Sequence, residues 1–233
     1  MIHLLLAFQL QRTVAVTIDD LPIISEVRTA ANDDYITRNL LKTLQADKIP
    51  AIGFVNEGKM FGHPNRTEIL KRWLDARMDL GNHSYSHHDL NTTPLDEFQR
   101  DVLNGERITS RLLKERGRKI RYFRHPFLHS GADLKKKRAF ESWLHAHGYE
   151  VAPVTIDNMD FIYARAYERA KLSGKLERAS EIGRQYVAYM DRIFAFYEDQ
   201  SRKILKREPA QTLLLHASLL NADYMDELVA MMK

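Results

Sequence analysis

The chain has 233 residues, of which 44% are hydrophobic and 28% charged, so it holds enough apolar content for one globular domain with a large buried core. Its formal charge is only +4, and no basic run interleaved with aromatic residues indicates a nucleic-acid groove. It contains no cysteine, which excludes disulfides, thiolate metal ligands and a cysteine nucleophile.

The start of the chain is apolar from Met1 to Phe8, but it lacks a basic segment and is short for a signal peptide. We interpret it as either the remnant of a trimmed leader or the approach to the first strand. No later segment comes near the roughly 18 consecutive apolar residues of a spanning helix, so we expect no membrane span.

The hydrophobic pattern predicts strands that alternate with helices. In chain order we expect a strand at 13–18, a helix at 34–48, a strand at 51–55, a helix at 67–78, a short strand before His83, a helix at 94–114, a strand at 120–123, a helix at 135–147, a strand at 150–154, a helical stretch at 161–207 with a break near 173–174, a strand at 212–215 and a helix at 223–232. Asn32 or Asp33 is the expected cap of the first helix.

This alternation predicts a mainly parallel sheet with helical cover, in one domain over residues 1–233. In such folds ligands gather beyond the carboxyl ends of the strands. Polar residues that could carry chemistry follow the predicted strands at this edge: Asp19, Asp20, His83, His87, Arg124 and His216.

Two histidines four residues apart, His83 and His87, could turn both rings to one side and hold a divalent metal together with a carboxylate. Such a set leaves coordination positions open for water. The spacing alone is a weak signal because the chain has ten histidines, but the acids Asp19 and Asp20 strengthen it. The alternative is that the acids cap a turn and the histidines are ordinary loop residues.

The paired acids suggest a division of work, in which one ligates the metal and the other acts as a general base. The spacing does not reveal which of Asp19 and Asp20 takes which part. Arg124 could orient one of them or simply lie on the surface. His216 could be a satisfied core histidine or the proton donor to a leaving group.

Taken together, these segments resemble the polysaccharide deacetylases of carbohydrate esterase family 4, the NodB-homology domain. Segments similar to the five motifs of that family occur in the family's order: Thr-Ile-Asp-Asp at 17–20, His-Ser-Tyr-Ser-His at 83–87, Arg-His-Pro-Phe at 124–127, Asp-Asn-Met-Asp-Phe at 157–161 and Leu-Leu-His at 214–216. The resemblance implies a distorted (β/α) barrel with fewer strands than eight, mainly parallel, and with a long helical insertion at about 162–208 before the last strand.

The resemblance also implies roles for individual residues. Asp20, His83 and His87 would bind a divalent metal, usually zinc. Asp19 would be the general base, oriented by Arg124, which Asp157 would hold. His216 would be the general acid. The expected substrate-binding residues are Phe127, through its backbone N–H, together with Leu214, Phe161 and Tyr85.

Three departures from the family pattern concern the pocket and the barrel. Phe161 stands where the family has tryptophan. The helical stretch before the last strand is long, and it could form a lid, a partner surface or plain helical packing. The chain also stops soon after His216, so we expect either a shortened chain or a barrel closed in another way, by the inserted helices or by a second subunit in a homo-oligomer.

The resulting hypothesis is a metal-dependent hydrolase that removes acetyl groups from an N-acetylated carbohydrate, using metal-activated water. Its alternatives are an O-acetyl carbohydrate esterase and a non-catalytic carbohydrate-binding relative. We expect an acetylated carbohydrate as partner and no nucleic acid. By family analogy the protein would act in the periplasm or outside the cell, although no clear signal peptide is visible.

Overall fold

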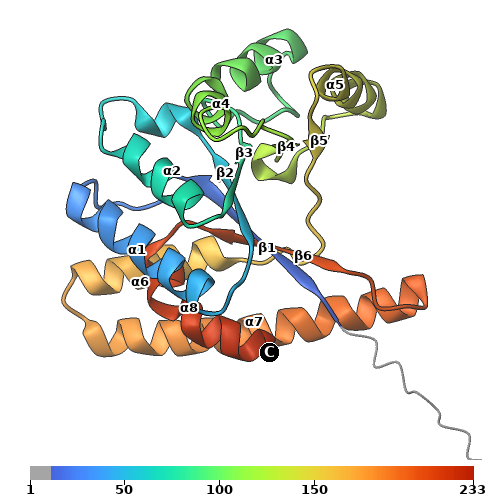
Figure 1. The fold of residues 1–233 in the computed structure, drawn as a ribbon. Coiled ribbons are helices and arrows are strands. Elements are labelled where there is room, and N and C mark those ends of the chain that lie inside the picture. Colours follow the sequence, from blue (N-terminus) through green and yellow to red (C-terminus); the bar gives the residue numbers. More distant parts are fainter. Residues whose placement is uncertain (1–11) are drawn as a thin grey trace, which may run out of the picture.

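Six parallel strands form one curled sheet in the computed structural model, which describes residues 12–233 (Figure 1). They are β1 (Val14–Leu21), β2 (Ala51–Val55), β3 (Asp79–Asn82), β4 (Tyr122–Phe123), β5 (Glu150–Val151) and β6 (Gln211–His216). Their order is β5-β4-β3-β2-β1-β6, and every neighbouring pair is parallel. The predicted distorted (β/α) barrel with fewer than eight strands is therefore confirmed.

Helices cover the sheet and connect its strands (Figure 1). The α-helices are α1 (Ala30–Ala46), α2 (Arg66–Asp75), α3 (Leu95–Asn104), α4 (Arg107–Lys114), α5 (Leu134–Ala146), α6 (Asp160–Leu172), α7 (Leu176–Leu205) and α8 (Leu219–Met232), and the short 3₁₀ helices are η1 (Glu57–Met60) and η2 (Pro126–Leu128). Within residues 12–233 we find no helix that combines the length and the apolar character needed to cross a membrane. The predictions for Met1 to Phe8 lie outside the described residues.

One extended stretch of chain, residues 150–156, joins the two edges of the sheet. At its start, the Ala152 N–H donates to the carbonyl of Phe123 on β4 (2.8 Å). At its end, the Ile156 N–H donates to Thr212 on β6 (3.0 Å). Between them lies Pro153, which has no N–H to offer a ladder. The predicted strand at 150–154 therefore ends at Val151, and the chain itself bridges the open side of the barrel.

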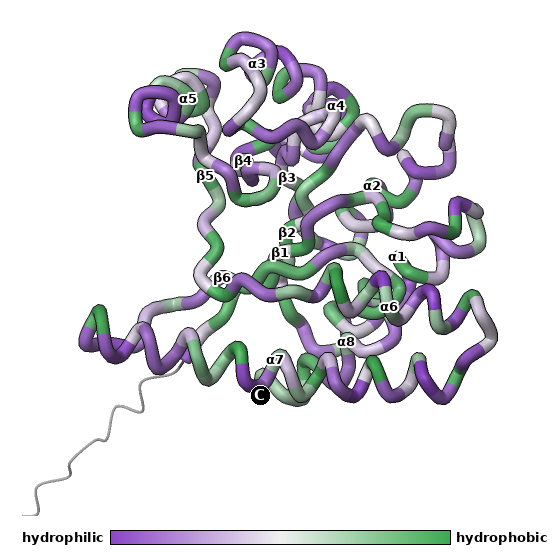
Figure 2. Tube along the Cα trace, turned by 180° about the vertical axis from the view of Figure 1, so that it is seen from behind, coloured by the Kyte–Doolittle hydropathy of each residue, from purple (hydrophilic) through white to green (hydrophobic). Residues whose placement is uncertain are grey.

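Two apolar clusters support this sheet. The larger one packs β1, β2 and β6 against α1, α2, α7 and α8, with fully buried residues such as Ile18 and Trp73. The smaller one joins α3, α5 and β4 through Phe98, Phe123 and Phe140, whose rings meet edge to face at 5.1–6.3 Å. Figure 2 shows apolar colouring along the central strands and polar colouring on outer turns of α3 and α5.

Helix boundaries differ from the prediction at two starts. α1 begins at Ala30 because the Thr29 side chain caps it, accepting from the Asn32 N–H (3.2 Å). The expected cap Asp33 is instead buried and paired with Arg66 (2.9 Å). α8 begins at Leu219, four residues early, because Ser218 caps it.

The predicted single helix at 94–114 is two helices, α3 and α4, separated at Gly105. A Cβ atom on Gly105 would overlap the backbone of Ser84 and Tyr85, in the loop that carries the histidine pair. The helix therefore breaks where the histidine loop passes against it. This close approach ties the position of that loop to α3.

The helical stretch at 161–207 has the predicted break, since α6 ends at Leu172 and α7 begins at Leu176. α7 buries Ile182, Tyr186 and Met190 in the main core, against α6 and α8. The stretch is thus packed against α8 and the main core on the side of β6, which agrees with the alternative of helical packing.

We expect Gly105→Ala to destabilise the protein by about 2 kcal/mol, because a methyl group would push on backbone atoms that cannot rotate away. The backbone of Gly105 has a φ of −82°, which alanine adopts freely, so without this contact the substitution would be neutral or stabilising. Urea unfolding measures the difference. Leu103→Ala on the exposed side of α3 is the control, with an expected change within about 0.5 kcal/mol. A Gly105→Ala protein as stable as the parent would contradict the close approach.

Candidate active site and metal centre

The chemically useful residues converge at the carboxyl ends of the parallel strands. Asp19 and Asp20 lie near the end of β1, the histidine loop follows β3, Arg124 follows β4 and His216 ends β6. Most of these residues border one cavity of about 530 Å³. Its lining comprises Asp19, Asp20, Ile24, His83, His87, His125, Phe127, Leu128, His129, Asp157, Asn158, Met159, Phe161, Leu214 and His216.

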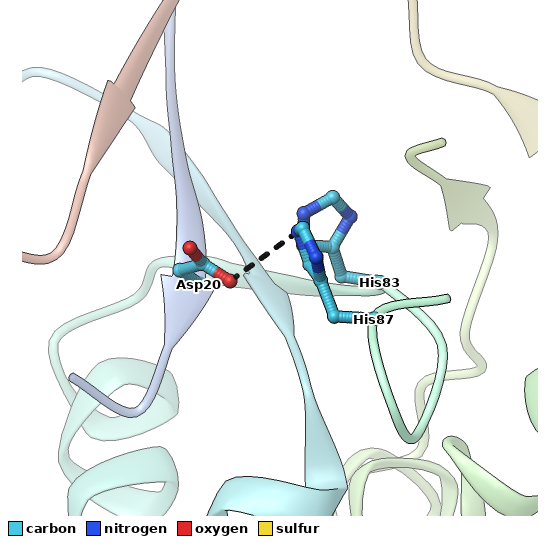
Figure 3. A group of neighbouring side chains, drawn as sticks. All are labelled: Asp20, His83 and His87. Carbon is cyan, nitrogen blue, oxygen red and sulfur yellow. Dashed lines mark ion pairs between the residues drawn. The ribbon is translucent and has the colours of Figure 1, made fainter. Parts of the chain in front are cut away.

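Asp20, His83 and His87 form a compact set of three possible ligands. One oxygen or nitrogen atom from each lies within 4.8 Å of the other two (Figure 3). Asp20 rather than Asp19 completes this set, which is the choice that the sequence spacing left open. Asp20 and His83 are buried and His87 is half-buried.

The protonation states of these three residues suit a cation. The Nδ1 of His83 lies 2.8 Å from the Arg124 carbonyl, and because a carbonyl only accepts, Nδ1 carries the proton and Nε2 offers its lone pair. Burial lowers the pKa of His83 to about 3 and also lowers that of His87, so both rings are neutral. Burial alone would raise the pKa of Asp20, but the positive charges of Lys59 and His216 hold it well below its usual range. A neutral pair of imidazoles and an ionised carboxylate are the forms that ligate a divalent metal.

Strained backbone and short polar contacts hold the ligand loops. Asp20, Ser84 and His87 all have left-handed φ values of 57–69°, which are unfavourable for residues other than glycine. The Ser84 N–H donates to the Asn82 side chain (2.7 Å), and the Ser84 hydroxyl accepts from the His87 N–H (3.1 Å). The carboxylate of Asp101 on α3 accepts from the Ser86 N–H (3.0 Å). The surrounding side chains thus fix the turn that brings both rings together.

Asp19 is buried beside the metal-ligand set and contacts a buried cation. Arg124 Nη1 lies 3.3 Å from the Asp19 carboxylate, while Arg124 Nη2 donates to the Thr17 hydroxyl (3.0 Å). Burial raises the pKa of Asp19 to about 6, and the positive charges of Arg124 and His216 limit that rise. Asp19 is therefore ionised at neutral pH but more basic than an ordinary aspartate.

Asp157 does not make the predicted contact with Arg124. The guanidinium donates to Asp19, to Thr17 and weakly to the Pro153 carbonyl (3.5 Å), whereas the exposed Asp157 accepts from the Asn158 N–H (2.8 Å). Burial lowers the pKa of Arg124, and the charges of Asp19 and Asp157 oppose that effect. Asp157 thus acts on Arg124 through charge at a distance and lines the cavity itself.

His216 has a buried carboxylate partner, Asp160, to which the sequence analysis gave no role. His216 Nδ1 lies 2.6 Å from Asp160 Oδ1, and the His216 backbone N–H donates to Oδ2 (2.8 Å). Burial disfavours the protonated ring, but the charge of Asp160 and its hydrogen bond outweigh burial and raise the pKa of His216 to about 9. His216 is therefore an imidazolium at neutral pH. Asp160 belongs to the segment at 157–161 that resembles the fourth motif, but the sequence did not indicate that it pairs with His216.

A chain of hydrogen bonds connects this pair to α7 and α8. The Tyr186 hydroxyl on α7 donates to Asn221 Oδ1 on α8 (2.7 Å). Asn221 Nδ2 in turn donates to Asp160 Oδ2 (2.8 Å) and to the His216 carbonyl (2.9 Å). All the side chains between Tyr186 and Asp160 are fully buried, so the orientation of His216 depends on α6, α7 and α8 together.

Apolar side chains form much of the cavity wall. The Phe127 ring lies 4.5 Å from the His87 ring and is 57% exposed, and the Phe161 ring lies 6.1 Å from His216 and is 47% exposed. Leu214 also lines the cavity. The fourth predicted wall residue, Tyr85, is not brought into the site. It lines a separate hollow together with Phe61.

The sequence analysis gave no role to two further residues at the site, His125 and Lys59. His125 lines the cavity with its ring buried and neither nitrogen hydrogen-bonded, and burial lowers its pKa to about 4. Lys59 lies with its Nζ 2.7 Å from Asp20 Oδ1. The signal for Lys59 was its place just after β2, at the same edge of the sheet as the other polar residues.

Comparison with known proteins gives both a family and a fold. The family model described as polysaccharide deacetylase matches residues 9–152 of this chain. A carbohydrate esterase family 4 pseudoenzyme from Bacillus anthracis has a TM-score of 0.60 at 17% identity over 94% of this chain. The match covers 60% of that pseudoenzyme, so this chain spans less than two thirds of its length.

Two other solved structures share the fold over more of their own length. A polysaccharide deacetylase from Bacillus cereus has a TM-score of 0.65 at 15% identity, covering 95% of this chain and 87% of that chain. The peptidoglycan deacetylase PdaC from Bacillus subtilis has a TM-score of 0.55 at 20% identity, covering 94% and 82%. These similarities to solved structures concern the fold.

The His216–Asp160 pair predicts a pH-dependent contribution to stability. Because the folded-state pKa of His216 is raised from 6.5 to about 9, its contribution is fully present below pH ~6.5 and is lost as the pH rises through 9. We expect the stability difference between the parent and His216→Gln to fall by roughly 3 kcal/mol from pH 6 to pH 10. Urea unfolding at several pH values measures this difference. A difference that stays constant over that range would contradict the assigned ion pair.

Proposed function

The chain belongs to the polysaccharide deacetylase family, and from this premise we propose that it is a metal-dependent hydrolase removing acetyl groups from a carbohydrate. One observation carries the proposal. A buried acid whose pKa is raised to about 6, Asp19, and an imidazole whose pKa is raised to about 9, His216, border the same cavity as the three possible metal ligands. A pair of titratable groups shifted in this way suits a base and an acid acting at neutral pH.

The residues Asp20, His83 and His87 would hold the cation, zinc by family analogy. When bound, such a cation supplies Lewis-acid chemistry that polarises an acyl carbonyl and makes water more acidic. The buried Oδ1 of Asp20 lies 3.7 Å from His87 Nε2, a separation that a shared cation could bridge, so this oxygen fits a ligand atom. The proton on His83 Nδ1 fixes the ring so that Nε2 faces the same point.

Asp19 takes the proton from the attacking water in the proposed reaction. Arg124 keeps the Asp19 carboxylate in place, and its charge keeps the base ionised near neutral pH. The carbon–oxygen bond from water forms at the acetyl carbonyl, and the bond to the sugar nitrogen or oxygen breaks. His216 gives its proton to that leaving atom, so that acetate and a free amine or hydroxyl result.

The backbone N–H of Phe127 is a candidate donor to the oxygen that becomes negative. Phe127 has a left-handed φ of 57°, and among the hydrogen bonds of residues 12–233 none uses its N–H as donor. The adjacent Phe127 ring and the Phe161 ring on the His216 side offer apolar faces against which sugar rings can pack. We include this donor and these two faces in the proposal.

The apolar lining favours a second candidate, an O-acetyl carbohydrate esterase. Ile24, Leu128 and Met159 add exposed apolar surface to that of the two phenylalanine rings. Such a wall is compatible with a sugar whose hydroxyls are partly esterified and therefore less polar.

Because acetylated polymers mostly lie outside the membrane, action outside the cytoplasm is part of either proposal.

The central test is acetate release from chitooligosaccharides, peptidoglycan fragments and acetylxylan, with and without a chelator. We expect release from at least one of them, with loss of more than 90% of the rate after metal removal and recovery with Zn²⁺. Comparison of an aryl acetate with an N-acetylglucosamine oligomer separates the two candidates. Absence of metal-dependent release from all of these substrates would refute the proposal.

Asp19→Asn tests the assignment of the base. We expect the rate to fall by at least about 10²-fold, the usual range for loss of a general base, while the affinity for Zn²⁺ stays within a few-fold. Glu141→Gln, which changes an exposed carboxylate on α5, is the control and should keep the parent rate. An Asp19→Asn enzyme with an unchanged rate would show that another group accepts the proton.

A further inference from the structure

The ammonium group of Lys59 lies directly against the carboxylate of the metal-ligand set. Its Nζ is 2.7 Å from Asp20 Oδ1 and 3.3 Å from the Asp20 carbonyl oxygen. The same Oδ1 lies 3.7 Å from His87 Nε2, so this oxygen faces both the lysine and the imidazole. A positive charge of the protein thus occupies the neighbourhood in which a cation would be held.

The backbone around Lys59 is fixed by contacts that bring its side chain to this position. The preceding residue, Gly58, donates its N–H to the Tyr85 carbonyl in the histidine loop (3.1 Å) and has no room for a Cβ atom there. The Lys59 carbonyl accepts from Arg66 Nη1 (2.6 Å). η1 is therefore docked on the loop that carries two of the ligands, which indicates a built contact rather than a chance surface ion pair.

We propose that Lys59 is a resident counter-cation of the ligand set, which holds Asp20 in place in the metal-free protein and competes with the metal for Oδ1. The inference rests on the proposed metal site. Asp20 is buried and has a left-handed φ of 69°, so both its charge and its backbone conformation are unfavourable without a partner close by. The two contacts from Lys59 compensate both.

The competition follows from charge. A unit charge about 4 Å from a divalent cation changes its affinity by well over tenfold at the effective dielectric of a protein surface. The Lys59 side chain is 28% exposed, so it can turn toward solvent when a metal occupies the ligand set. The ligands are then preorganised, but the metal binds more weakly than it would to the same three ligands without the lysine.

The test is the dissociation constant for Zn²⁺, measured by competition with a chromophoric chelator at one pH. We compare the parent with Lys59→Met and with Lys59→Gln, which keeps a hydrogen-bond donor and removes the charge. Both variants should bind Zn²⁺ at least 10-fold more tightly. Lys71→Met removes a lysine that is paired with Glu68 on α2 and should leave the constant within twofold of the parent.

Thermal unfolding gives a second readout that does not depend on activity. The metal-free Lys59 variants should unfold several degrees below the parent, and Zn²⁺ should raise their Tm by more than it raises that of the parent. Equal or weaker Zn²⁺ binding by both variants would overturn the inference and leave the proposed function intact. If neither the parent nor the variants bind any divalent cation, the proposed function fails together with the inference.

Discussion

The whole site depends on the burial of two adjacent carboxylates at the end of a central strand. Asp19 and Asp20 are 2% and 6% exposed, and buried charges of the same sign are strongly unfavourable without partners. The chain provides different partners for each, Arg124 for Asp19 and Lys59 with two imidazoles for Asp20. These partners come from the segments that follow β2, β3 and β4, so the contacts of the two carboxylates depend on the arrangement of these strand ends.

The different partners give two neighbouring acids different chemistry. The first keeps a pKa near 6 because burial exceeds the effect of Arg124, whereas the second is surrounded by several positive or polarisable groups and stays ionised. His216 is shifted in the opposite direction by Asp160. Environment, and not residue type, thus separates the pKa values of the titratable groups that border one cavity.

The sequence predicted the fold well because the pattern of apolar runs determines a parallel sheet and its functional edge. The strand ends predicted that Asp19, Asp20, His83 and His87 share that edge, the family resemblance singled out Asp20, and the structure brings Asp20, His83 and His87 together. Contacts between segments far apart in the chain were not predictable. The partner of His216 lies 56 residues away, and the break at Gly105 is caused by a loop that begins some twenty residues earlier. The direction of a side chain within a motif was not predictable either. Tyr85 belongs to the second motif, but it lines a separate hollow and not the cavity of the site.

The hydrogen bonds from Tyr186 through Asn221 to Asp160 connect the long helical hairpin of α6 and α7 to the candidate site. A hairpin of this length inserted before the last strand looks like an accessory that a smaller relative could lack. Here the buried Tyr186 hydroxyl on α7 is the outermost member of the hydrogen-bonded group that holds His216. A minimal version of this protein that omits α7 would therefore have to be redesigned around His216, far from the deletion itself.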